Sequence, residues 1–547
     1  MLHLMKWHIA VSLVILSFAS WAEDQDYREA IREEIEQLRH TGRLSLGEVD
    51  VASGNLLAEV YERRGFMPAW SGMERLESLI ELVEATSADG LDPEDYHLSK
   101  LEHVYELHVS GHEPSPQERA ALDIGMTDSL IRLGYHQRFG KVDPHKLDAT
   151  WNFSRDLGGE DPVTVIQKAI DAPSLIDFRD EIFPRHELYR RLQAALANYR
   201  RLAEAGGWPQ VPAGAALKPG NADGRLETLA RRLAVTGDLP EVARIDYSVY
   251  GGELEVAVKR FQQRHGLDAD GIVGPTTLMA LNVPVESRID QIRVNLERGR
   301  WVLANLEDDF VVVNIAGYRA LLIRGNDVQW STRVAVGKPY RKTPVFRSEM
   351  TYIVFNPTWT VPYSIATKEI LPQLQRDQSY LASRNFIIKD RDGRIVDPAG
   401  VDWRSLSPRD FPYTLVQQSG PGNALGEIKF MFPNEHGVYL HDTPSKGLFD
   451  RAGRTFSHGC VRVEKPFELA EQLLARDGWD AARVAAVRRS GETTTVFLSK
   501  PMPVLLLYWT TEVGDDGRVY FYEDVYDRDK GILNALNSPF RFDLPGS

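Results

Sequence analysis

The spacing of apolar residues changes once along this chain, and the change divides it into two structural classes. Upstream of about residue 308, apolar residues recur every three or four positions, in stretches such as YREAIREEIEQLRH and PRHELYRRLQAALANYRRLAEAG. This spacing is typical of amphipathic helices. Downstream they alternate, as in MTYIVFNPTWTVP, which predicts strands joined by turns. We therefore expect a multidomain α+β protein with a helical first part and a mostly-β last domain over residues 308–547.

Polar and glycine-rich segments subdivide the helical part. Residues 23–222 are expected to form a helical scaffold domain that ends in the Pro/Gly-rich linker GWPQVPAGAALKPGNADG. Residues 223–285 form a compact unit of short helices, because Leu254, Val258 and Phe261 share one helix face and PTTLMALN begins a further helix with proline in its first turn. An amphipathic helix over residues 286–307 bridges this unit to the β domain.

A long segment, residues 364–421, interrupts the β pattern of the last domain. It contains a helical stretch, ATKEILPQLQRD, and a hairpin-like stretch, FIIKDRDGRIVDP. Long insertions into a strand framework often form lids or binding elements. We therefore expect a capping insertion over the domain that carries it.

The first 22 residues resemble an export signal. Lys6 provides a positive flank, an apolar run extends from Ile9 to Ala19, and Ser20 and Ala22 are small residues at the cleavage-determining positions. The run is too short to span a bilayer comfortably, because spanning takes about 20 apolar residues. We expect export to the periplasm, and a membrane tether would arise only if the signal stays uncleaved.

The net charge of the chain argues against two classes of partner. Its formal charge is −14 over 547 residues, and it contains no basic run. Nucleic acids and anionic membrane surfaces attract proteins with basic patches. The sequence therefore favours neither as a partner.

Cys460 is the only cysteine of the chain. A protein with one cysteine cannot form an internal disulfide, and an oxidising compartment threatens an idle exposed thiol. Cys460 is therefore either buried, as a small apolar residue, or used chemically. Its neighbours favour chemical use.

The residues around Cys460 can supply what a nucleophilic cysteine needs. Such a thiol requires a nearby base, a means of activation and donors for a developing oxyanion. His441 lies at the end of an expected strand, Gly459 allows the backbone a tight turn, and Arg462 can add positive potential or bind a substrate carboxylate.

Taken together, these residues resemble a known catalytic signature. His441, followed after residues 442–456 by Ser457-His458-Gly459-Cys460 and then Arg462, resembles the motif of the L,D-transpeptidases of the YkuD fold. The stretches VAVGKPYRKTP, FNPTWTVP, GPGNALGEIKFMFPN and YLHDTPSK are similar to the large multidomain YcbB-type members of Gram-negative bacteria. Residues 223–285 resemble the small three-helix peptidoglycan-binding domain, with its pattern AVxxFQxxxGLxxDGxxGxxTxxAL.

Two positions depart from the family pattern. Many relatives carry asparagine where Arg462 stands, and Val345-Phe346 follow the TP pair in place of the glycine of smaller members. Neither departure touches the nucleophile or the base. Both leave details of the substrate open.

The resemblance implies a reaction on the stem peptides of peptidoglycan. Cys460 would attack the third residue of a tetrapeptide donor, with His441 as the base, and an acceptor stem would resolve the thioacyl-enzyme to give a 3→3 cross-link. The backbone amides of Gly459 and Cys460 would form the oxyanion hole, with Tyr439 adding a hydroxyl and Ser457 in support. His458 would either hold the structure or contact substrate. The resemblance implies no cofactor and no metal, and it names carbapenems as inhibitors.

Three alternatives remain open. A metal site could use His441, His458 and Cys460, with His436 as a further candidate ligand, but His-x-Cys is too tight for typical zinc ligand pairs. The same thioacyl intermediate could be hydrolysed, giving an L,D-carboxypeptidase or amidase. Finally, the chain could be a non-catalytic peptidoglycan-binding scaffold.

Overall fold

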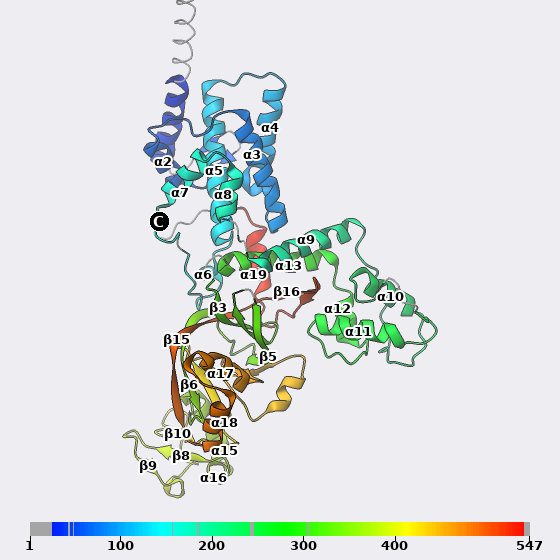
Figure 1. Ribbon diagram of the computed structural model, residues 1–547, viewed down its shortest axis with the longest axis vertical. Coiled ribbons are helices and arrows are strands. Elements are labelled where there is room, and N and C mark those ends of the chain that lie inside the picture. The colour runs from blue at the N-terminus through cyan, green and yellow to red at the C-terminus, as the bar shows by residue number, and fades with distance from the viewer. Residues whose placement is uncertain are drawn as a thin grey trace, which may run out of the picture.

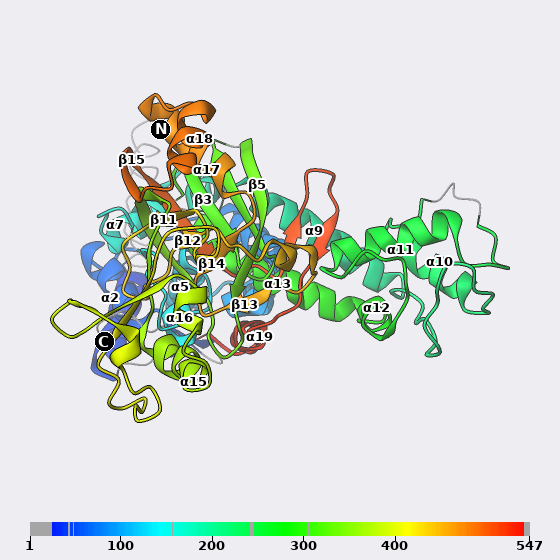
Figure 2. The ribbon, with the colours of Figure 1, turned by 90° about the horizontal axis from the view of Figure 1, so that it is seen from below.

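The computed structural model describes residues 25–540 except 42–43, 47–48, 156, 183, 185, 241–244, 304–305 and 326. The expected export signal, residues 1–22, therefore lies outside the described residues. Three parts follow one another along the chain (Figure 1): a helical domain, a three-helix unit and a β domain. Seen from below, the three-helix unit projects sideways from the other two parts (Figure 2).

The helical domain begins with a helix over residues 25–41 and a small ladder of two strands. Its longest helix is stabilised at its start by a capping box, in which Ser115 and Glu118 each bind the other's backbone N–H. No helix in the described part of the chain is long and apolar enough to cross a membrane. The elements are β1 (Ser45–Leu46), β2 (Val49–Asp50), α2 (Gly54–Arg63), α3 (Met73–Glu84), α4 (Leu98–Val109), α5 (Pro116–Phe139), α6 (Pro144–Leu147), α7 (Pro162–Asp171), α8 (Leu175–Ile182) and α9 (Glu187–Glu204).

The three-helix unit has a hydrophobic core of its own. It consists of α10 (Leu226–Val235), α11 (Gly252–Arg264) and α12 (Pro275–Leu281). Part of the segment expected to be a linker packs into this core: Val211 and Leu217 are buried in it, and Leu217 pairs with Val273 through two backbone hydrogen bonds of 3.2 and 3.0 Å. The expected linker has no helix or strand of its own, but its two apolar side chains complete the core of the three-helix unit.

Helix α13 (Val285–Val302) lies beside α9 and connects the three-helix unit to the β domain (Figure 1). A hairpin of β16 (Thr511–Val513) and β17 (Val519–Phe521) packs against the same region. The Arg264 guanidinium, ion-paired with buried Asp238 at 2.6 Å, donates to the Val519 carbonyl at 2.6 Å. The three-helix unit is thereby fixed to the β domain.

The β domain is built on a nine-stranded sheet that closes on itself. The strand order is β13-β5-β14-β12-β11-β6-β15-β3-β4, and β4 also pairs with β5. Because β4 pairs with β5, the sheet closes and β4 does not present a free edge. Strand β13 pairs with β5 alone. The strands are β3 (Asp309–Asn314), β4 (Arg319–Arg324), β5 (Asp327–Gly337), β6 (Phe346–Phe355), β11 (Ile428–Met431), β12 (Leu440–His441), β13 (Thr455–Ser457), β14 (Val461–Val463) and β15 (Thr494–Leu507). Helices α17 (Pro466–Leu474), α18 (Ala481–Ser490) and α19 (Asp529–Leu536) complete the domain.

The segment between β6 and β11 folds around a separate core. The expected hairpin is present, since β8 pairs with β9 antiparallel. A five-residue π-helix, η4 (Ala366–Ile370), interrupts its helical stretch, and such π turns are frequent at functional sites. The remaining elements are β7 (Trp359–Thr360), α14 (Tyr363–Ile365), α15 (Leu371–Leu374), α16 (Tyr380–Ser383), β8 (Phe386–Lys389), β9 (Ile395–Val396) and β10 (Thr414–Gln417).

Candidate active site

Two neighbouring strands bring the candidate base and nucleophile together. β12 and β14 are parallel, with Leu440 opposite Val461 and His441 opposite Arg462. The Val461 N–H donates to the Tyr439 carbonyl at 3.1 Å, so the pairing extends back to Cys460. Because alternate residues of a strand share a face, the side chains of Tyr439, His441, Cys460 and Arg462 gather on one face of the sheet.

The ring orientation of His441 suits a general base. The buried imidazole places Nδ1 2.5 Å from the Asp442 carbonyl oxygen. A carbonyl oxygen only accepts, so Nδ1 carries the proton and the lone pair lies on Nε2. Only glycine fits at position 426 next to Asp442, because an added Cβ would lie 2.3 Å from the Asp442 carboxylate.

The resting pair is neutral. Burial lowers the pKa of His441 to about 3, and the charge of Arg462 lowers it further. Burial raises the pKa of the Cys460 thiol, although hydrogen bonds from Tyr439 and the charge of Arg462 oppose this rise. In this resting state the thiol donates to the Gly437 carbonyl, with 3.7 Å between Sγ and the oxygen.

The loop before Cys460 has one amide committed to an internal contact. The Gly459 N–H donates to the Ser457 hydroxyl oxygen at 3.1 Å, and that hydroxyl donates to the Cys460 carbonyl at 2.5 Å. The expectation that the Gly459 amide helps form the oxyanion hole therefore does not hold in this structure. The Cys460 amide is the backbone donor that remains, with the Tyr439 hydroxyl beside the thiol.

Thr343, which sequence reasoning did not single out, holds the peptide that contains the Cys460 amide. Its hydroxyl donates to the Gly459 carbonyl at 2.8 Å and accepts from the Gly337 N–H at 2.9 Å. The C=O and N–H of a trans peptide point in opposite directions, so fixing the Gly459 oxygen fixes the direction of the Cys460 N–H. Tyr526 braces the loop from behind, donating to the Gly337 carbonyl at 2.6 Å and accepting from the Thr343 N–H at 3.1 Å.

Replacing Thr343 with valine should lower turnover without removing the nucleophile. The change leaves the Gly459 carbonyl and the Gly337 N–H without their partner, and a reacting group misplaced by about 1 Å can lose about 10²-fold in rate. We expect kcat to fall about 10- to 100-fold, and the free energy of unfolding to fall by about 1–3 kcal/mol. Thr343→Ser keeps the hydroxyl and should retain most of the activity. Unchanged kcat in Thr343→Val would contradict the positioning role.

The inserted segment contacts the cysteine motif directly. His458 Nε2 lies 2.6 Å from Glu369 Oε1, and Glu369 belongs to the π-helix η4. A guanidinium nitrogen of Arg341 lies 4.0 Å from the same oxygen. The side chain of His458 therefore faces the insertion, and Glu369 is a second residue that sequence reasoning missed.

Arg462 has an unused donor next to the reacting pair. Its side chain is mostly buried, and among the described residues its Nε has no hydrogen-bond partner. Its charge acts on both His441 and Cys460. The guanidinium thus adds positive potential to this face of the sheet, with one buried nitrogen left without a partner in the described part of the chain.

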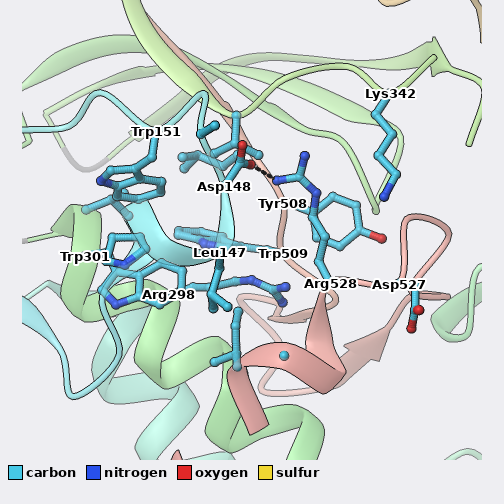
Figure 3. A pocket seen from close by; sticks show the side chains of 17 residues that line it. Leu147, Asp148, Trp151, Arg298, Trp301, Lys342, Tyr508, Trp509, Asp527 and Arg528 are labelled. Carbon is cyan, nitrogen blue, oxygen red and sulfur yellow. Dashed lines mark hydrogen bonds and ion pairs between the residues drawn. The ribbon is translucent and has the colours of Figure 1, made fainter. Parts of the chain in front are cut away.

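A cavity of 270 Å³ is lined in part by Lys342 and Val345 of the loop between β5 and β6 (Figure 3). Trp151 and Trp301 form one side of it, and Arg528, ion-paired with Asp148, points in from another. Lys342 donates to the Tyr526 carbonyl at 2.7 Å. The cavity does not contain Cys460, so it is separate from the catalytic pair.

The metal alternative receives no support from the geometry. Within the residues that the structure describes, no three or more His, Cys, Asp or Glu side chains are grouped to hold an ion. The imidazole of His458 is instead engaged by Glu369.

Three family models match the chain. They are described as "L,D-transpeptidase catalytic domain" over residues 308–496, "Putative peptidoglycan binding domain" over residues 223–281, and "Scaffold domain" over residues 55–196. Among curated proteins, the "Putative L,D-transpeptidase" of Haemophilus influenzae is 38% identical over 248 residues, which cover 45% of this chain and 50% of that protein. The chain thus matches about half the length of this relative.

Solved structures of L,D-transpeptidases show weaker similarity. The enzyme from Stackebrandtia nassauensis is 14% identical with a TM-score of 0.21, and the match covers 55% of this chain and 96% of that one. An L,D-transpeptidase in complex with imipenem is 14% identical with a TM-score of 0.16, over 37% of this chain and 61% of that one.

The family matches fall on the parts that the structure separates. The catalytic model covers the closed sheet with His441 and Cys460, and the binding model covers the three-helix unit. Residues 308–496 are therefore an L,D-transpeptidase catalytic domain of the YkuD family, which this chain carries together with a peptidoglycan-binding domain.

Proposed function

We propose that the protein is a peptidoglycan L,D-transpeptidase that forms 3→3 cross-links between tetrapeptide stems. The observation that supports this proposal is the parallel pairing of β12 with β14, with His441 opposite Arg462, because the strand alternation then puts the buried His441 on the same face as Cys460 within the matched catalytic domain. A thiol with a base beside it is the arrangement for acyl transfer through a thioester.

The reaction would proceed in two acyl transfers. The Cys460 sulfur attacks the carbonyl of the third stem residue while its proton passes to His441 Nε2. The Cys460 N–H and the Tyr439 hydroxyl receive the developing oxyanion, and His441 returns the proton to the departing D-Ala amine. The side-chain amine of an acceptor stem then attacks the thioester, which frees the thiol and forms the cross-link.

The insertion between β6 and β11 would act as a cap during these steps. Its contact with the cysteine motif through Glu369 and His458 supports this role. Closing such a cap excludes water, which favours an amine acceptor over hydrolysis. The apolar run from Ile9 to Ala19 supports our further proposal that the protein is exported and works in the periplasm.

The test is incubation with purified tetrapeptide muropeptides, followed by mass analysis of the products. A cross-linked dimer lacking one D-Ala supports transpeptidation. Tripeptide alone indicates hydrolysis of the thioacyl intermediate, and no product would support a scaffold that lacks catalysis.

Deleting residues 223–285 should weaken binding to the wall more than it harms the thiol. This unit has its own core and matches a peptidoglycan-binding model. We expect the deletion variant to sediment several-fold less with insoluble sacculi, whereas labelling of Cys460 by a small electrophile continues. Equal sedimentation of the two proteins would instead assign the unit the role of a spacer.

A further inference from the structure

A groove of 860 Å³ runs between the peptidoglycan-binding unit and the catalytic domain. Residues 266–277 of the binding unit line one side. Tyr318, residues 331–333 of β5 and the loop 452–454 line the other. The volume lies at the upper end of the range usual for ligand pockets, so the groove suits an extended ligand.

The two walls of the groove are held in a fixed relation. The Ala452 N–H donates to Asp268 Oδ1 at 3.0 Å across it. Nearby, His265 of the binding unit stacks on Phe261 and on Phe521 of the C-terminal hairpin, with ring centroids 3.8 and 5.7 Å apart. The groove is therefore preformed rather than created by a ligand.

The charges along the groove balance. A ligand with many phosphates would require an excess of cations, whereas the lining offers charged groups of both signs and the partly exposed, amphipathic ring of Tyr520. These features suit an uncharged, hydroxyl- and amide-rich chain. The charged lining residues are Asp268, Asp270, Glu464 and Glu523, and Arg319, Arg333, Arg454 and Lys465.

The distance from Cys460 to the groove is similar to the distance from the third residue of a stem peptide to the sugar that carries the stem. Glu464, at the groove, follows Cys460 along β14, and the alternation of the strand puts Cys460, Arg462 and Glu464 on one face. At about 3.3 Å per residue, Glu464 lies roughly 13 Å from Cys460. The third residue of an extended stem lies roughly 10 Å from the sugar that carries the stem.

We propose that this groove binds the glycan strand that carries the donor stem. The stem passes over Arg462 to Cys460, while the amino-sugar chain lies between Tyr520 and the turn of the binding unit. The inference rests on the proposed function for the identity of the stem. It adds a glycan site that belongs jointly to the two domains.

Two blocking variants test the groove from opposite walls. Thr276→Trp and Ser331→Trp replace small, exposed lining residues with large ones. Met279→Trp and Gln329→Trp are matched controls, because both residues are exposed on the same elements but outside the lining. Binding of stem-free glycan strands is measured in a Cys460→Ala background, which removes the chemistry. Thermal unfolding checks the fold of each variant.

We expect both blocking variants to raise the Kd for glycan strands at least about 10-fold, and both controls to bind as the parent does. Equal binding by the blocked proteins, equal losses in the controls, or no binding by the parent would each overturn the glycan site. The proposed function is judged separately, because the Cys460 protein is assayed on free tetrapeptides without sugar. Cross-links from free tetrapeptides together with unaltered glycan binding in the blocked variants would reject the groove and keep the transpeptidase.

Discussion

Cys460→Ala is expected to abolish cross-link formation while the protein stays folded. The side chain is small and only partly buried, so its loss leaves the sheet intact. The reaction as proposed has no other nucleophile, since Cys460 is the single cysteine. Removing the nucleophile of an acyl-transfer enzyme costs on the order of 10⁶-fold in kcat. Mass analysis of muropeptides after long incubation should detect no dimer.

Cys460→Ser distinguishes the chemistry of the thiol from its shape. A neutral hydroxyl is a far weaker nucleophile than a thiol, and it gives up its proton to a base much less readily because a hydroxyl is much less acidic. We expect this variant to be nearly as inactive as Cys460→Ala and to unfold at a temperature close to that of the parent. Turnover near the parent's level in either variant would remove Cys460 from the mechanism.

The features that the sequence predicted well are those determined by residues close together in the chain. His441 was expected at the end of a strand, and it is the last residue of β12. The core of the peptidoglycan-binding unit follows from the helical spacing of Leu254, Val258 and Phe261, all of which are fully buried. Local pattern suffices in these cases because each element is specified by its own residues.

The contacts that sequence did not predict join distant segments. Thr343 lies 116 residues before Gly459, and Glu369 lies 89 residues before His458. Nothing in either local pattern identifies its partner, because packing of the whole domain decides the contact. The hydrogen bond from the Gly459 amide to the Ser457 hydroxyl is a different case. The two residues are close in sequence, but the sequence does not determine the rotamer of the serine side chain.

The packing of the linker could not be predicted for a similar reason. Proline and glycine mark a segment without regular structure, but they do not show whether that segment is anchored. Val211 exchanges two hydrogen bonds of 2.8 Å with the side chain of Asn282. A side chain 71 residues away therefore ties down backbone that composition alone assigns to a linker.

A carbapenem should acylate Cys460, and His441→Ala should slow that acylation about 10²- to 10⁴-fold. A strained β-lactam carbonyl needs only a nucleophile, a base and an oxyanion donor, which the site supplies in Cys460, His441 and the Cys460 N–H. The protein should gain the mass of one carbapenem, mapped to the peptide that contains Cys460. The factor expected for His441→Ala is that of losing a general base. His436→Ala is the matched control, since His436 packs against Phe346, 5.1 Å between ring centroids, and should react as the parent does.

The pH dependence of this acylation tests the assignment of the base. Neutral imidazole is the active form, so a folded-state pKa lowered to about 3 keeps His441 competent down to low pH. The rate should therefore change little between pH 7 and pH 5. A histidine at its ordinary pKa of about 6.5 would be almost wholly protonated at pH 5, and the rate would fall about 25-fold between pH 7 and pH 5. Such a fall, acylation of a serine, or a full rate in His441→Ala would each contradict the Cys460–His441 mechanism, because each requires a base or a nucleophile other than the buried pair on β12 and β14.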